Sequence, residues 1–348
     1  VGLAAAGTVE RIVGFDLDPA TSRRALELGA VHIAATSAAQ AVEQADLVVV
    51  ATPVGSIPQT FASVKTYLRS GAIVTDVGST KSGIVEEISV LISPDVHFIG
   101  GHPMAGSERE GIEAATADLF RDSYWILTPT SQTDAAAYSS LVRFITGLGA
   151  KVLSLDADRH DEAVALTSHL PQILASTLMR FAADVAGAEG GLPLLASGGF
   201  RDMTRIAGSS PALWMGILKE NSAALVDVLG RYSGSLESVR AAIDTGDWNV
   251  VSKMLTDARS ARSTLAAKSG RKSGDLVEVR ITVPDRPGVL ADVATSLGEA
   301  SINIEDLDIQ HSPEGGRGIL RILVEASDAD ATRSILVGRG FDVRAEEP

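Results

Sequence analysis

Short apolar runs alternate with longer amphipathic stretches over the first 155 residues of the chain. Continuous apolar runs separated by helical patterns are typical of strands in a parallel sheet that helices cover on both faces. We therefore predict a doubly wound α/β domain over residues 1–155. The expected strands cover residues 11–16, 47–52, 72–77, 96–101, 124–127 and 151–155.

A different period follows, in which apolar residues recur every three or four positions. This spacing predicts amphipathic helices, so we expect an all-helical domain over residues 156–267. Helices with this much apolar surface bury it against a partner subunit as well as against each other, and we therefore expect a homodimer. The apolar positions of the first long helix include Leu166, Leu170, Ile173, Leu174, Leu178 and Phe181.

The end of the chain has a third pattern. Residues 268–275 carry no apolar side chain and include two glycines, which is typical of a linker. Strand patterns at residues 276–283, 302–304 and 319–324 follow, interleaved with a helical pattern, and a last helix and strand complete the set. The order β-α-β-β-α-β predicts a ferredoxin-like domain over residues 276–348.

Composition limits the partners and the chemistry. The 348 residues carry a formal net charge of −14, whereas surfaces that bind nucleic acid or anionic membranes need basic patches. No apolar segment is long enough to span a membrane and no secretory signal pattern opens the sequence, so we expect a cytoplasmic protein. The absence of cysteine excludes disulfides, thiolate metal sites and a cysteine nucleophile.

Two short strings supply a proton acceptor and an anion-binding group. Residues 100–106 read Gly-Gly-His-Pro-Met-Ala-Gly after an apolar run, so a turn between glycine and proline fixes His102 at a strand end. Ligands bind at the carboxyl ends of parallel strands, and histidine exchanges protons near neutral pH. Arg205, in Asp-Met-Thr-Arg-Ile-Ala, has a planar guanidinium that suits bidentate capture of a carboxylate. The alternative for Arg205 is a structural salt bridge with Asp202 or Glu220.

Two strand ends beside His102 add hydroxyl groups to the same predicted edge. Thr52-Pro53 and Gly78-Ser79 each follow an apolar run. Either pair alone is an ordinary turn, but Thr, Ser and His at three strand ends of one edge indicate a binding site. Ser79 can hydrogen-bond the imidazole or a substrate hydroxyl, which would fix the tautomer of the histidine.

The helical region contributes two more candidates. His169 precedes Pro171 in a Ser-His-Leu-Pro string, and the proline lacks a backbone N–H, so we expect a helix kink beside the histidine. A kink there indicates a pocket wall, with a packed core histidine as the alternative. Trp214 is either part of the core or a surface on which a substrate stacks.

The first predicted domain is Rossmann-like and has one candidate for nucleotide binding. Asp16 ends a predicted strand, where a carboxylate accepts hydrogen bonds from ribose hydroxyls and repels a 2′-phosphate. This favours NAD over NADP. Asp18 is the better helix cap, and Arg23 and Arg24 keep NADP open.

The phosphate-binding turn expected before that strand is incomplete. The sequence has no Gly-x-Gly-x-x-Gly, and it opens with Val-Gly-Leu-Ala-Ala-Ala-Gly. Gly2 would start the turn, and a stretch missing between Leu3 and Ala4 would explain its loss. A separation of their Cα atoms well beyond about 3.8 Å would confirm such a break.

Together these strings resemble the prephenate and arogenate dehydrogenase family of tyrosine biosynthesis. The resemblance runs from about residue 8 to residue 265. It rests on Gly-Gly-His-Pro-Met-Ala-Gly-Ser-Glu, Ser-His-Leu-Pro, Gly-Gly-Phe-Arg-Asp-Met-Thr-Arg-Ile-Ala and Pro-Ala-Leu-Trp, in this order. The tail, with Val-Pro-Asp-Arg-Pro-Gly-Val-Leu at residues 283–290, looks like an ACT domain, a module that typically binds amino acids.

The resemblance implies NAD-dependent oxidative decarboxylation of prephenate to 4-hydroxyphenylpyruvate. NAD⁺ would take hydride from the ring carbon that bears the hydroxyl, His102 would accept the hydroxyl proton, and loss of the ring carboxylate as CO₂ would leave an aromatic ring. Arg205 would hold the side-chain carboxylate and Glu108 would line or gate the pocket, with no metal required. A tyrosine effector would bind near Gly288 and Asn303, at a helix N-terminus.

Other interpretations remain open from the sequence. An arogenate dehydrogenase would give tyrosine directly, and no residue decides between arogenate and prephenate. β-Hydroxyacid dehydrogenases also join a dinucleotide domain to a helical one, but they resemble a pattern centred on a catalytic lysine, which residues 168–178 lack. A non-catalytic sensor of an aromatic amino acid is the third interpretation, because the glycine turn is incomplete.

Overall fold

The chain forms two compact units in the computed structural model, Val1–Gly234 and Ser235–Pro348. The predictions for Gly2, for the incomplete turn and for Glu108 lie outside the described residues. The domain boundaries at residues 155, 267 and 275 stay predictions. The structure describes residues 9–106, 111–186, 198–268, 276–284, 286–311 and 316–344.

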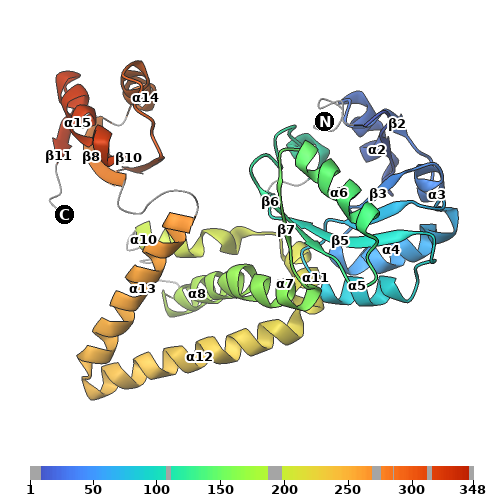
Figure 1. The fold of residues 1–348 in the computed structure, drawn as a ribbon. Helices are drawn as coiled ribbons and strands as arrows, with labels where there is room; N and C mark the ends of the chain where they lie inside the picture. The colour runs from blue at the N-terminus through green and yellow to red at the C-terminus, as the bar shows by residue number, and fades with distance from the viewer. Residues whose placement is uncertain are drawn as a thin grey trace. The chain divides into compact units, whose positions relative to one another are not determined.

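A five-stranded sheet organises the first unit, in the order β3-β4-β5-β6-β7 (Figure 1). A separate pair of short parallel strands, β1 and β2, precedes it in the chain. The parallel strand pairs of the five-stranded sheet and the helices on both of its faces (Figure 1) confirm the doubly wound arrangement. The strands are β1 (Val13–Gly14), β2 (Ile33–Ala34), β3 (Leu47–Val50), β4 (Ile73–Asp76), β5 (His97–Pro103), β6 (Tyr124–Thr128) and β7 (Lys151–Ser154).

The predicted parallel pairing is wrong at one place, because β5 and β6 run antiparallel while the other neighbours in the sheet are parallel. A parallel neighbour needs a crossover connection, which is usually a helix. The described residues between β5 and β6 hold only the short 3₁₀ helix η3 (Ile112–Ala114). Strand β2 was not predicted, because its two residues are too few to form a recognisable apolar run.

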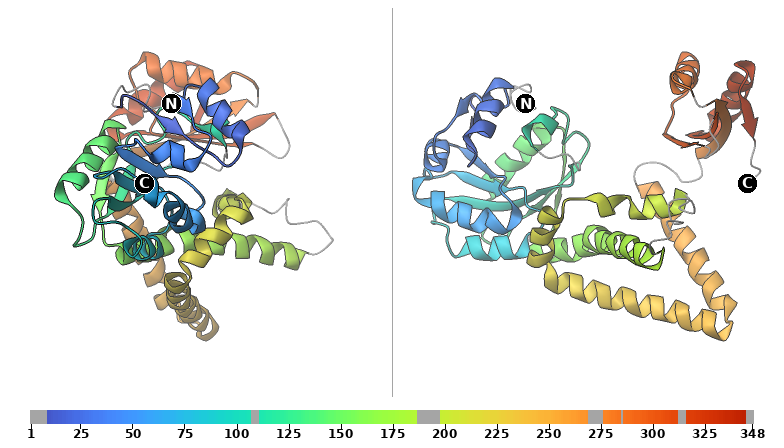
Figure 2. Two further views of the ribbon diagram at one scale, coloured as in Figure 1. Left: turned by 90° about the vertical axis from the view of Figure 1, so that its right-hand side faces the viewer. Right: turned by 180° about the vertical axis from the view of Figure 1, so that it is seen from behind.

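Helices cover both faces of the sheet (Figures 1 and 2). Phe61 is fully buried on one face and Leu141 is almost fully buried on the other, and burial of such a side chain contributes about 1.5–3 kcal/mol. Neighbouring residues of one strand serve opposite faces, so Val74 packs with Phe61 and Ile73 with Leu141. The covering helices are α4 (Ile57–Val64) and α5 (Ser82–Ser89) on one face and α6 (Ala135–Gly147) on the other.

Helix α2 (Pro19–Glu27) begins directly after the cap that the sequence predicts, Asp18. The carboxylate of Asp18 accepts a hydrogen bond of 2.9 Å from the backbone N–H two residues on. Gly29 follows the helix with a φ of +67°, in the left-handed region that favours glycine. Asp18 is therefore the cap, and the carboxylate of Asp16 has no part in capping α2. The next helix is α3 (Ala38–Val42).

Helices replace strands after β7. Helix α7 (Ala157–Val164) continues through a π-helical turn (Ala165–His169) into α8 (Leu170–Ala186). A kink is expected beside His169, and the structure has a π-helical turn there, since Pro171 cannot donate to the carbonyl that a regular helix would pair with it. No helix in the described part of the chain is long and apolar enough to cross a membrane. Further helices are α10 (Gly198–Thr204), η6 (Arg205–Gly208), α11 (Pro211–Glu220), α12 (Ser222–Thr245) and α13 (Trp248–Lys268).

The end of the second unit has the predicted β-α-β-β-α-β order, in an antiparallel sheet ordered β11-β8-β10-β9. The strand expected at residues 302–304 begins later, at Asp306. Ile302 instead closes the end of helix α14, where its N–H donates to the carbonyl of Leu297 at 3.0 Å. The elements are β8 (Leu276–Pro284), α14 (Val289–Glu299), β9 (Asp306–His311), β10 (Arg317–Glu325), α15 (Ala329–Gly338) and β11 (Asp342–Arg344).

Candidate active site

His102 lies where β5 extends past its parallel neighbour. The pairing of β5 with β4 ends at Ile99, and the last residues of β5 pair with β6 alone. Glycine is required just before the histidine, because a Cβ on Gly101 would lie 2.7 Å from the carbonyl oxygen of Asp76. The imidazole of His102 is half-buried at this strand end.

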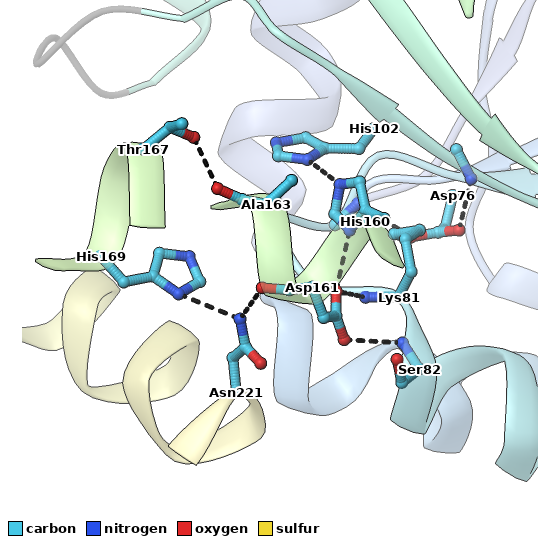
Figure 3. A network of polar contacts seen from close by, with 12 residues as sticks. Asp76, Lys81, Ser82, His102, His160, Asp161, Ala163, Thr167, His169 and Asn221 are labelled. Carbon is cyan, nitrogen blue, oxygen red and sulfur yellow. Dashed lines mark hydrogen bonds and ion pairs between the residues drawn. The ribbon is translucent and has the colours of Figure 1, made fainter. Parts of the chain in front are cut away.

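A second histidine and an aspartate extend from His102 in a line (Figure 3). The Nδ1 atom of His102 lies 2.8 Å from Nε2 of His160, and the rings meet edge to face at a centroid distance of 5.0 Å. On its other side, His160 Nδ1 lies 2.8 Å from Oδ1 of Asp161. We call His102, His160 and Asp161 the His102 triad.

The carboxylate of Asp161 is anchored at the N-terminus of α5. It accepts backbone N–H bonds from Lys81 at 2.7 Å and from Ser82 at 2.8 Å. Burial raises the pKa of Asp161, but the hydrogen bonds from His160, Ser82 and Lys81 outweigh it, so the net shift is downward. Asp161 is therefore an ionised acceptor at neutral pH.

A buried ion pair supports the same strand end. Lys81 and Asp76 are fully buried, and the ammonium of Lys81 binds the carboxylate of Asp76. Asp76 also accepts the backbone N–H groups of Gly78 at 2.9 Å and Gly101 at 3.0 Å. Burial lowers the pKa of Lys81, while Asp76 acts in the opposite direction. Asp76 thus ties the end of β4 to the residue before His102.

The helical part of the first unit supplies the other side of the network. Asn221 donates from Nδ2 to the backbone carbonyl of Asp161 at 2.8 Å and to Nδ1 of His169 at 3.2 Å (Figure 3). The buried ring of His169 meets Trp214 edge to face, at 6.0 Å between centroids. Trp214 in turn packs against the core cluster of α4, α5 and the strands. The network therefore joins the sheet to the helices.

Both predicted histidines are uncharged at neutral pH. Burial, followed by the nearby His160, Lys81 and His169, lowers the pKa of His102 to about 3, with Asp161 acting in the opposite direction. Burial lowers the pKa of His169 to about 4, again against Asp161. The neutral ring of His102 thus has a lone pair over the whole neutral range, whereas the lone pair of His169 accepts the hydrogen bond from Asn221.

Arg205 lies in η6 and is exposed. The alternative of a structural salt bridge to Asp202 or Glu220 is not observed. Within the described residues the guanidinium of Arg205 has no hydrogen-bond or ion-pair partner. Its fork is therefore open to an external anion, and its role as a carboxylate clamp stays a prediction.

The predicted hydroxyl-bearing residues lie at the ends of β3 and β4. Thr52 Oγ1 lies 3.3 Å from Oγ1 of Thr60, and Pro53 precedes the 3₁₀ helix η1 (Val54–Ser56). Ser79 lies half-buried between β4 and α5. Nδ1 of His102 is bonded to His160, and the hydrogen bond of Ser79 to the imidazole or to a substrate hydroxyl stays a prediction.

The nucleotide-binding candidates lie near β1. Asp16 is exposed, and its Oδ1 accepts the backbone N–H of Asp18 at 2.8 Å. Arg24, one of two residues that kept NADP open, is engaged by carboxylates of Glu27 at 3.0 Å and Glu113 at 2.6 Å. Oδ2 of Asp16 has no hydrogen-bond partner among the described residues and remains as an acceptor at this strand end.

Sequence reasoning missed the residues that support His102. His160 and Asp161 lie in a polar stretch that reads as a solvated helix face, and Lys81 lies in a polar turn. The adjacent His-Asp pair one helix before Ser-His-Leu-Pro is the signal that could have found the first two. Lys81 had no comparable local signal.

Family models match almost the whole length of the chain. Residues 2–154 match the nucleotide-binding domain of prephenate dehydrogenase, residues 156–257 match its dimerisation domain, and residues 277–336 match the ACT domain. The chain is 32% identical to prephenate dehydrogenase of Bacillus subtilis over 326 residues, which cover 92% of this chain and 86% of that protein.

Solved structures agree with these matches. Prephenate dehydrogenase from Aquifex aeolicus, solved with hydroxyphenyl propionate and NAD⁺, superposes with a TM-score of 0.71 at 28% identity, over 76% of this chain and 92% of that one. Arogenate dehydrogenase from Synechocystis gives a TM-score of 0.67 at 31% identity, over 76% of this chain and 96% of that one. Because the two family models cover residues 2–154 and 156–257 and the Bacillus subtilis enzyme is 32% identical over 92% of the chain, this chain belongs to the prephenate dehydrogenase family.

Proposed function

We propose that this chain catalyses the NAD-dependent oxidative decarboxylation of prephenate to 4-hydroxyphenylpyruvate. The observation that carries the proposal is the uncharged, half-buried imidazole of His102 at the end of β5, within a network that joins the sheet to the helices. Membership of the family supports it, as does the likeness to a structure that holds NAD⁺ and hydroxyphenyl propionate.

The task of the protein in this reaction is to hold one proton and to orient the ring. His102 accepts the proton of the ring hydroxyl as the C–O bond gains ketone character. Cleavage of the bond to the ring carboxylate releases CO₂ and leaves its electron pair in the ring, and the resulting phenolate takes the proton back from His102. Ser79 hydrogen-bonds the same hydroxyl. Bound NAD⁺ supplies the acceptor for the hydride from the carbon that bears the hydroxyl.

Four residues are proposed to hold the cofactor: Asp16, Thr52, Pro53 and Ser79. Their positions fit a dinucleotide, because they follow the carboxyl ends of β1, β3 and β4, and open sheets bind nucleotides there. Asp16 accepts from the ribose hydroxyls, since one of its oxygens remains for them after the bond to the following turn. The engagement of Arg24 by carboxylates supports NAD over NADP. Gly2 belongs to the proposed phosphate turn.

Arg205, His169, Trp214 and Glu108 are proposed to bind the substrate. Arg205→Ala is expected to raise KM for prephenate about 10- to 100-fold, the equivalent of one charge-assisted hydrogen bond, with kcat within about threefold. A clamp that holds the ground state and the transition state equally contributes uniform binding. Steady-state kinetics measure both constants. Arg205→Lys, which keeps the charge but loses the fork, should fall between, and an unchanged KM in the alanine variant would place the clamp elsewhere.

A spectrophotometric assay of prephenate and arogenate, each with NAD⁺ and with NADP⁺, tests the proposed function. We expect the highest kcat/KM with prephenate and NAD⁺. Arogenate is the second candidate, because the Synechocystis arogenate dehydrogenase is also similar to this chain. A higher kcat/KM with arogenate would assign that substrate, and no turnover in any arm would leave the non-catalytic sensor as the interpretation.

We propose a homodimer as the working assembly. The helices that match the dimerisation domain expose large apolar side chains, and exposed apolar patches mark protein interfaces. A chain that sediments as a monomer would contradict this assembly. We propose no nucleic-acid or membrane partner. The cytoplasmic location stays a prediction. The exposed apolar residues include Phe181, Val185, Val226, Leu236, Trp248 and Leu255.

Tyrosine is proposed as an effector at the ACT domain. Gly288 precedes α14 with a φ of +91° and no side chain caps the helix, so backbone N–H groups are open to a carboxylate. Asn303, whose Nδ2 now donates to Glu305 at 2.7 Å, is the second proposed contact. Calorimetry with the full chain should show saturable heat on adding tyrosine. The absence of heat with tyrosine would overturn the assignment.

A further inference from the structure

We propose that His160 and Asp161 position His102, by holding its proton on Nδ1 and leaving Nε2 as the acceptor for the substrate hydroxyl. The proposal rests on the proposed function, in which His102 accepts that proton. It gives a role to two buried residues to which the proposed function assigns none. They are positioning residues, since they act through His102.

The hydrogen bonds along the His102 triad favour this tautomer. An ionised carboxylate only accepts, so Nδ1 of His160 donates to Asp161 across 2.8 Å. A neutral imidazole carries one proton, and Nε2 of His160 is then an acceptor. The Nδ1 atom of His102, 2.8 Å away, must donate to it. The remaining nitrogen of His102, Nε2, is unprotonated and is free to accept.

The triad is held too firmly for its rings to exchange partners. His160 is fully buried, and its edge-to-face packing on His102 fixes the angle between the rings at 71°. The carboxylate of Asp161 is bonded to two backbone N–H groups at the start of α5, and its backbone carbonyl is bonded by Asn221. Rotation of Asp161 would leave buried N–H groups without acceptors, which is costly.

The same geometry serves the imidazolium that forms during the reaction. When His102 takes a proton on Nε2, Nδ1 still donates to His160, and the negative charge of Asp161 lies at the far end of the line. Burial disfavours a charged His102, and the negative charge of Asp161 counteracts this effect by stabilising the imidazolium. An aspartate that orients a histidine and stabilises its charged form is an established catalytic arrangement, and here a second imidazole lies between them.

Histidine tautomers are read directly from nitrogen chemical shifts, which need neither substrate nor turnover. The chain has six histidines, so the full protein labelled with ¹⁵N-histidine gives a spectrum that His102→Asn and His160→Gln variants can assign. We expect an Nδ1–H tautomer at His102 and at His160. An Nε2–H tautomer at His102 would overturn the proposal, as would a doubly protonated His160. Neither result depends on whether prephenate is the substrate.

The kinetics of three variants show whether His160 acts by accepting a hydrogen bond from His102 or only by packing against it. His160→Leu is expected to lower kcat about 10- to 100-fold with KM within about threefold, because the base loses its orientation. His160→Gln should recover about tenfold of that loss, since its side-chain oxygen can accept from His102. His97→Leu, a half-buried histidine at the other end of β5, is the matched control and should keep wild-type kcat.

Two kinetic results would overturn the proposal. One is an unchanged kcat in His160→Leu, and the other is equal kcat in the leucine and glutamine variants. Failure of the wild-type chain to turn over prephenate or arogenate would instead reject the proposed function, while the tautomer measured by NMR would still decide the geometry of the triad.

Discussion

Replacing His102 with asparagine is expected to lower kcat for prephenate by about 10² to 10⁴, the range for losing a general base, with KM within about threefold. The asparagine amide can donate to His160 from near the position of Nδ1, so the bond that holds the site together is kept. Nothing replaces the lone pair on Nε2. Steady-state rates of NADH formation at saturating NAD⁺ measure both constants.

The same substitution at the start of β5 provides the control for this variant. His97→Asn changes a half-buried histidine of the same strand. It should keep kcat within about twofold, because a substitution away from the site has a small effect. Near-normal turnover in His102→Asn would contradict the assignment of His102 as the proton acceptor. A large loss in both variants would point to a damaged strand instead.

Lys81→Met is expected to lower the free energy of unfolding of the first unit by about 3–5 kcal/mol, because it leaves the fully buried carboxylate of Asp76 without its counter-charge. The backbone N–H groups of Gly78 and Gly101 still bond Asp76 but do not neutralise it. Methionine has nearly the length of the lysine stem, so the cavity term is small. Urea unfolding followed by tryptophan fluorescence measures the change.

Two further variants separate charge from packing at this pair. Asp76→Asn combined with Lys81→Met removes both buried charges and should recover part of the loss, because the amide oxygen still accepts one of the two backbone N–H groups that Asp76 bonds. Lys151→Met breaks an exposed pair with Asp122, at 3.4 Å, and should change stability by less than about 1 kcal/mol. Equal losses in Lys81→Met and Lys151→Met would mean that the buried pair makes no special contribution.

Two histidines of the candidate site, His102 and His169, could be predicted from the local sequence. His102 is placed by a strand that ends between glycine and proline, and His169 by a proline that disturbs its helix, so both positions follow from rules that act over a few residues. His160 and Asp161 follow no such rule. Their helix α7 has a polar sequence, and only its packing against α5 buries that face. Lys81 is hidden for the same reason, since its partner Asp76 lies at the end of β4.

The fold shows the same division between local and distant information. Apolar runs located the strands well, but a run has the same pattern in a parallel and in an antiparallel pair, so the direction of β6 depended on the connection before it. In the second unit, Ile302 and Ile304 look like a strand because they are apolar and alternate. Ile302 is buried under the end of α14 instead, and the strand starts at Asp306.

The reaction and the role of His102 are tested together by one single-turnover experiment, with enzyme and NAD⁺ in excess over prephenate. NADH and 4-hydroxyphenylpyruvate are measured at each quench time in the wild-type chain and in His102→Asn. We expect the wild type to form both in equal amounts and at one rate, and the variant to form both more slowly by a common factor of about 10² to 10⁴. Wild-type rates in the variant, or a wild-type chain that forms neither product, would contradict the proposed mechanism.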